Sequence, residues 1–183
     1  MHLNLTPEQK KFYEEIVVGR RSSLVGPSAV VGDGGELLGP FGILIYEPVL
    51  GSTLQKVGEV LRFSSALSDR LREAIILLVA AFHSSGFEWN VHIELARESG
   101  ICEEDLDLLS QCQRPSLLEG VEIKIFDIAR DVLMRQVSET AIIDLNSDTE
   151  SPLLIHALTL VHYYGLLAEL MNLFGVESKI DRH

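Results

Sequence analysis

The chain has 183 residues, 46% of them hydrophobic, which suits one globular domain with a sizeable core. Its formal net charge of −12 argues against nucleic acid as a partner, because a phosphate backbone needs clustered Lys and Arg, and against docking on an anionic membrane. A small anionic substrate could bind to such a negatively charged protein only if the electrostatic potential at its binding site were locally positive.

The first residues show no apolar signal core, and no apolar run approaches the length of a membrane span. The two cysteines, Cys102 and Cys112, lie ten residues apart and form neither a C-x-x-C redox pair nor a metal pattern. We therefore expect a reduced, cytoplasmic protein that uses no metal and no cofactor.

Helix signals recur along the chain, while no segment shows sustained period-two alternation with turn dipeptides. Thr6 and Gln9 form a capping box at the first helix, Ser68 is an N-cap, and Gly100 is a natural helix stop. The predicted helices are residues 7–18, 49–63, 69–83, 87–98, 103–109, 118–135 and 153–173. The sequence thus predicts an all-α fold of six to eight helices in one domain, 1–183, with a Gly/Ser/Pro-rich loop over 19–42 and a polar tail over 178–183.

The break between the third and fourth predicted helices is the most informative part of the chain. The residues Ser84-Ser85-Gly86 can fold the second helix back against the first, so that the two pack antiparallel. Glu88 and His92 are four apart on the second helix, so their side chains are neighbours. This hairpin predicts that Glu73, His83, Glu88 and His92 come together.

The helix beside this cluster carries no charge from Ala74 to Phe82, so the cluster would lie against an apolar wall. Carboxylates and imidazoles in such a wall acquire shifted pKa values, as acid–base catalysis at neutral pH requires. His83, Glu88 and His92 are also suitable metal ligands, but their spacing matches no strong metal motif.

Plainer interpretations stay open for each of these residues. Glu88 and His92 also fit an ordinary surface ion pair, and Trp89 fits a core position of its helix. His83 fits a helix end, and Glu73 fits a first-turn residue that satisfies the helix dipole.

Two segments carry a resemblance to a known family. Residues 71–80 read LREAIILLVA, and residues 87–96 read FEWNVHIELA. They resemble the core of the carboxymuconolactone decarboxylase family, in which a helix beginning RLRE precedes YEW..H...A...G. Weaker matches flank this core, so that the resemblance spans 39–177; they are Gly39-Pro40-Phe41-Gly42, Tyr163-Tyr164 and Leu173-Phe174-Gly175-Val176.

The resemblance implies an alkylhydroperoxidase D-like helical bundle that forms a homo-oligomer, a trimer or a hexamer. The alkylhydroperoxidase D branch uses a Glu, a C-x-x-C pair and a His. On this chain Glu73 and His92 take the Glu and His positions, but Ser85 and Glu88 stand where the cysteines would be. A thiol peroxidase mechanism would have no nucleophile here, so the resemblance favours the decarboxylase-like branch.

The family's type reaction is a cofactor-independent loss of carbon dioxide from a small acidic lactone. The resemblance makes His92 the proton donor and Glu73 the residue that orients it, while Glu88 and His83 complete a proton relay. The residues assigned to the substrate are Ser85, Trp89 and Arg72, with Arg72 as the partner of its carboxylate.

Two alternatives remain at this stage. The first is a non-catalytic assembly protein that keeps the fold. The second is another acid–base reaction on the same scaffold, a hydration, isomerisation or cyclisation in a biosynthetic pathway. His162 stands where the family's last helix has a glycine, so the substrate and the role of this histidine stay open.

Overall fold

The computed structural model describes residues 5–19, 30–136 and 151–176. The predicted turn at 137–140, the tail and part of the 19–42 loop lie outside these ranges. The chain divides into two compact units, one made of residues 1–64 and 170–177 and the other of residues 65–169 and 178–183. The prediction of a single domain, 1–183, stays a prediction.

The first unit contains α1 (Pro7–Val18), α3 (Pro40–Leu44) and α4 (Pro48–Phe63). The predicted capping box is present, since Thr6 accepts from the Gln9 backbone and the Gln9 side chain accepts from the Thr6 backbone. α1 packs on α4. Gly51 allows this close approach, because a Cβ there would lie 2.9 Å from the ring of Phe12.

The loop expected over 19–42 ends earlier than predicted, because α3 begins at Pro40. Gly39 has a φ of 56°, which turns the chain sharply, and Pro40 then supplies a φ suited to the first helical position. Within the described part of this loop, an isolated bridge pairs Val31 with Leu37.

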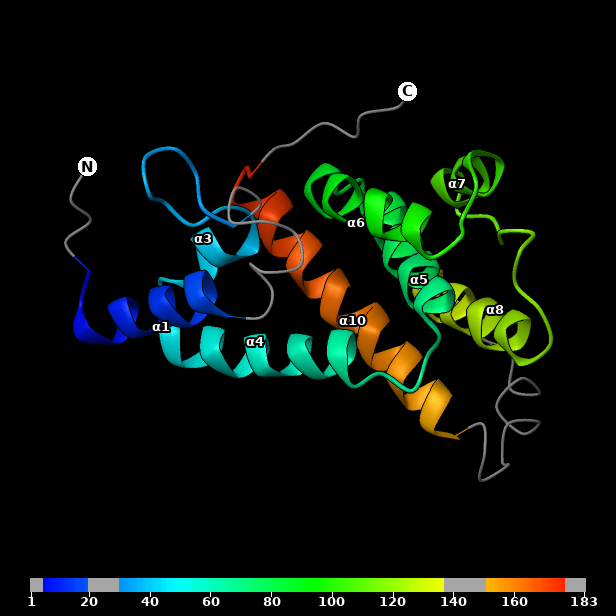
Figure 1. Ribbon diagram of the computed structural model, residues 1–183, viewed down its shortest axis with the longest axis horizontal. Coiled ribbons are helices and arrows are strands. Elements are labelled where there is room, and N and C mark those ends of the chain that lie inside the picture. The colour runs from blue at the N-terminus through cyan, green and yellow to red at the C-terminus, as the bar shows by residue number, and fades with distance from the viewer. Residues whose placement is uncertain (1–4, 20–29, 137–150, 177–183) are drawn as a thin grey trace. The chain divides into compact units, whose positions relative to one another are not determined.

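The second unit is built around α5 (Asp69–Phe82), whose residues from Glu73 to Ala80 are all buried. It packs on α6 (Gly86–Glu98), α7 (Glu103–Ser110) and α8 (Val121–Leu133), as the green to yellow-green ribbons of Figure 1 show. The longest helix, α10 (Ser151–Leu173), contributes residues up to 169 to this unit. The described residues contain eight helices and no strand, which confirms the all-α prediction.

Polar contacts fix the start of α5 against the start of α8. The Ser68 hydroxyl caps α5 by accepting from the Leu71 backbone and donates to Glu122 at 2.6 Å. Arg70 pairs with the same carboxylate at 2.8 Å. α8 begins three residues later than predicted, because Gly120 has a φ of 54° and ends the preceding loop in a left-handed conformation.

The break between α5 and α6 reverses the chain. His83 is the C-cap of α5, Ser84 has a φ of 54°, and the Ser85 backbone donates to the Ala80 carbonyl at 2.8 Å. This arrangement is typical of a helix that stops at a left-handed residue. Since α6 then packs along α5 more extensively than any other helix does, the predicted helical hairpin is present.

α10 corrects one expectation from the sequence. It has 23 residues with a best-window mean hydropathy of 1.4, so it is long and apolar enough to cross a membrane by length and composition. Close to half of that window is buried inside the structure, as in the core helix of a globular unit. Its buried residues include Leu160, Tyr164 and Leu167.

Candidate functional site

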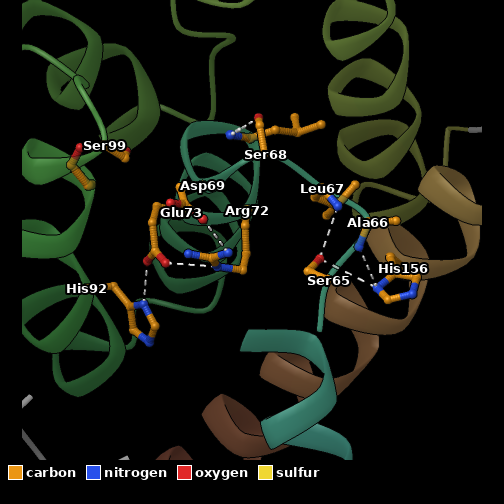
Figure 2. A network of polar contacts seen from close by, with 12 residues as sticks. Ser65, Ala66, Leu67, Ser68, Asp69, Arg72, Glu73, His92, Ser99 and His156 are labelled. Carbon is orange, nitrogen blue, oxygen red and sulfur yellow. Dashed lines mark hydrogen bonds and ion pairs between the residues drawn. The ribbon is translucent and has the colours of Figure 1, made fainter. Parts of the chain in front are cut away.

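Glu73 lies in the second turn of α5, and its side chain is only 2% exposed. One carboxylate oxygen accepts from Arg72 Nε at 3.2 Å, and Arg72 also donates from Nη1 to Asp69 at 2.8 Å. Figure 2 shows Glu73 between Arg72 on one side and His92 on the other. The carboxylate is therefore held in place by a cation on its own helix and by a ring from α6.

His92 is the centre of the site, with 1% of its side chain exposed. Its Nδ1 lies 2.7 Å from Glu73 Oε2, and its Nε2 lies 3.6 Å from Glu88 Oε2. When Nδ1 donates to Glu73, the neutral ring keeps its lone pair on Nε2, facing Glu88. A protonated ring carries an N–H on both nitrogens, each facing a carboxylate, and this arrangement favours the charged form of the ring.

Aromatic and aliphatic groups surround this cluster. The His92 ring meets Tyr164 of α10 edge-to-face, with 5.2 Å between centroids, and Tyr164 meets Tyr163 in the same way. Trp89 is buried on α6, and the uncharged run of α5 is buried as predicted up to Ala80. A hydrogen bond in such surroundings is stronger than in water. The structure therefore brings Glu73, Glu88 and His92 together in an apolar setting.

The residues predicted to bind the substrate lie close to this cluster in the sequence, but they differ in their burial and in their contacts. Ser85 is buried at the start of α6, where its side chain makes no capping hydrogen bond. Trp89 is 4% exposed and contributes to the core. Arg72 forms ion pairs with Asp69 and Glu73, so its guanidinium already binds two carboxylates of this chain.

His83 lines a pocket of about 400 Å³ in the second unit. It lies over α10, where a Cβ on Gly165 would come within 3.4 Å of the His83 Nε2. Burial lowers the pKa of His83, and the nearby Glu169 partly opposes this shift. The walls come from the ends of α5 and α8 and from α10; the residues are Phe82, His83, Val132, Leu133, Met134, Arg135, Val161, His162, Gly165, Leu166 and Glu169.

Sequence reasoning did not foresee this pocket. One face of α10 carries His162, Gly165 and Glu169, which are spaced at i, i+3 and i+7. This spacing does not identify the segments of the chain that lie opposite that face. The sequence places the charge-free wall of α5 beside the cluster that contains Glu73, Glu88 and His92. The pocket of 400 Å³ is lined by other residues.

The described ranges contain no group of three or more His, Cys, Asp or Glu side chains that could hold a metal ion. The two cysteines lie outside the cluster and disfavour the thiolate form. Burial raises the pKa of Cys112. At Cys102 a hydrogen bond with the Asp105 backbone lowers the pKa of the thiol. A hydrogen bond with Glu104, partial desolvation and the negative charges of Asp105 and Glu104 have a larger effect in the opposite direction, so the pKa is raised overall.

Comparison with known families agrees with this geometry. Residues 48–120 match the model of the Carboxymuconolactone decarboxylase family, and this segment contains Glu73, Glu88 and His92. The resemblance found in the sequence is thereby confirmed over that segment, and the all-helical structure agrees with an alkylhydroperoxidase D-like bundle. No curated protein and no solved structure matches the chain.

Proposed function

We propose that this chain, whose residues 48–120 carry the pattern of the carboxymuconolactone decarboxylase family, is a cofactor-independent lyase. Its substrate would be a small acidic lactone or a related carboxylate. The observation that carries the proposal is the buried His92, whose two ring nitrogens each face a carboxylate, Glu73 at 2.7 Å and Glu88 at 3.6 Å.

The proposed decarboxylation requires a proton donor for the dienolate carbon and no cofactor. The bond to the departing carboxylate breaks, and its electron pair moves into the unsaturated lactone carbonyl as a dienolate. Protonated His92 then gives its proton to carbon, while Glu73 holds the ring and stabilises its charge. Because Glu73 holds Nδ1, the proton leaves from Nε2, and Glu88, which faces Nε2, passes a replacement proton from solvent to that nitrogen. A general acid placed in this way contributes roughly 10²- to 10⁴-fold to the rate.

His92→Gln and His92→Ala test the proposal. Each should lower turnover of the responsive member of a panel of unsaturated lactone acids by about 10²- to 10⁴-fold, measured as carbon dioxide release. His156→Gln is the matched control, because His156 accepts from the Ala66 backbone and takes no part in the cluster. Equal turnover in His92→Gln and the wild type would contradict the role of His92. If the product is isomerised or hydrated and no carbon dioxide is released, the protein catalyses another acid–base reaction and is not a decarboxylase.

We further propose that the protein works in the cytoplasm as a homo-oligomer, a trimer or a hexamer. Several large apolar side chains are exposed on the single chain, among them Tyr46, Val49 and Leu173. Symmetric association is the usual way in which such surfaces become covered. A non-catalytic assembly protein of the same fold would share this surface, but it would not need the buried His92 cluster.

A further inference from the structure

The inward face of α4 has an unusual composition for a buried helix face. Its residues Gly51, Gln55, Gly58 and Arg62 recur at spacings of four, three and four, and all four are buried. Beside the aliphatic Leu61, which is also buried, the helix thus buries two glycines, an amide and a guanidinium.

Gln55 is 4% exposed, and neither its Nε2 nor its Oε1 has a hydrogen-bond partner in the described part of the chain. Buried side-chain amides are almost always hydrogen-bonded, because leaving one unsatisfied costs about 1–3 kcal/mol. An amide with both ends open therefore needs a physical reason.

Arg62 is a second buried polar side chain, and it carries a full positive charge. It is 7% exposed, and within the described residues no carboxylate pairs with it. Other arginines of the chain behave differently; Arg70, Arg72, Arg97, Arg114 and Arg130 each pair with at least one carboxylate. A guanidinium is seldom buried without a counter-charge, since desolvation of an unpaired ion is costly.

We propose that α4 carries a binding site for a small carboxylate, with the Arg62 guanidinium as its anchor and the Gln55 amide as a second donor. The planar fork of an arginine matches the two oxygens of a carboxylate. One guanidinium balances one negative charge, so a monoanionic carboxylate fits this face better than a phosphate dianion does in a chain of net charge −12.

Helix geometry allows both groups to serve one ligand. Gln55 and Arg62 are separated by about 10 Å along the axis at 1.5 Å per residue, and long side chains on a helix lean toward its N-terminus. By this tendency the Arg62 guanidinium would lie nearer to Gln55 than the separation along the axis indicates.

This inference goes beyond the proposed lyase function. It concerns binding by the first unit, and it can be measured without any turnover. The sequence assigned carboxylate recognition to Arg72, but the structure gives that guanidinium to Asp69 and Glu73. Failure of the lyase proposal would appear in the turnover of the His92 variants, whereas failure here appears in binding alone.

Thermal unfolding of the full chain tests the proposal, with sodium benzoate and sodium acetate as probes and sodium chloride at equal ionic strength as the reference. A carboxylate at about ten times its Kd should raise the Tm of the wild type by about 3–5 °C. Arg62→Met should abolish this shift and should also raise the ligand-free Tm by about 2–4 °C, because it removes a buried unpaired charge. Lys56→Met, the matched control, removes an exposed charge from the same helix and should keep the carboxylate shift.

Two further variants keep the test decisive if Arg62→Met does not fold. Arg62→Lys keeps the charge but loses the fork, and it should reduce the carboxylate shift by at least half. Gln55→Leu should weaken the shift and raise the ligand-free Tm. The proposal is overturned if no carboxylate shifts the wild type, if phosphate shifts it as much as benzoate, or if Arg62→Lys and Gln55→Leu both keep the full shift.

Discussion

At the scale of single residues, the two carboxylates that bind Arg72 differ in burial and in their partners. Glu73 is 2% exposed and also receives His92, whereas Asp69 is 77% exposed. A carboxylate in water loses little when its ion pair is removed, while one in the interior leaves uncompensated charge on its partners. A comparison of the two residues therefore measures burial and the His92 contact together.

Glu73→Gln should therefore lower the free energy of unfolding by about 3 kcal/mol, because it leaves Arg72 and His92 without their shared acceptor. The matched change Asp69→Asn should cost less than about 1 kcal/mol. Chemical denaturation of both variants measures the difference. Equal losses would mean that the Glu73–His92 contact contributes no more than a surface pair.

His83 predicts how stability depends on pH. Burial lowers its pKa below the ordinary value of 6.5, so below that pH the unfolded chain binds the proton more readily than the folded protein does. The free energy of unfolding should consequently fall as the pH drops from 6.5 through the pKa of the folded protein. In His83→Gln this loss should be smaller.

The same comparison at pH 8 provides the control for His83, because the imidazole is neutral there in both states. Glu169 partly raises the pKa of His83, so Glu169→Gln should extend the pH-sensitive range to lower pH. A His83→Gln profile parallel to that of the wild type between pH 5 and 8 would contradict the assignment.

The cluster around His92 was predictable at this scale only in part. Glu88 and His92 are neighbours by helical spacing, and the chain break predicted that Glu73 would meet them. His83 is the C-cap of α5 and lines the pocket of 400 Å³, and its place in the proton relay stays a prediction. The burial of Arg62 was unpredictable, because the sequence does not distinguish it from a surface arginine.

At the scale of elements, the helices with caps or strong periodicity were predicted to within about three residues. α1 shows its capping box in the sequence, and α5 shows its Ser68 N-cap. α3 was missed because its five residues are too few to show a period. The start of α8 was misplaced, because the left-handed Gly120 is recognisable only from its backbone angles.

Ser84 gives the prediction for the α5–α6 hairpin. A non-glycine residue at a φ of 54° carries a steric cost of about 1–2 kcal/mol that glycine avoids, partly offset by the greater freedom of glycine in the unfolded chain. Ser84→Gly should therefore raise the free energy of unfolding by about 0.5–1 kcal/mol, measured by denaturation. Ser84→Val should lower it by more than 1 kcal/mol. A destabilised Ser84→Gly would show that the serine side chain makes a contact that matters more than its backbone angle.

At the scale of the whole molecule, the exposed apolar side chains of α4 predict association. Val49, Leu50 and Val60 are each at least half exposed on this helix. Light scattering should give a mass of three or six times 20.3 kDa. Val49→Glu combined with Val60→Glu should reduce that mass if this helix forms the interface, because burying two added charges per chain is costly. A monomeric wild type would contradict the assembly proposal.

The division of the chain has a consequence for its synthesis on the ribosome. The first unit draws on residues 1–64 and on residues 170–177, which are made last, whereas residues 65–169 of the second unit are contiguous. Because chains fold from the N-terminus as they emerge, α1, α3 and α4 are exposed to the cell before the end of α10 exists. The second unit therefore acquires its helices while the earlier part of the chain is still incomplete. We therefore expect the apolar side chains of α1 and α4 to stay more exposed until residues 170–177 have been made.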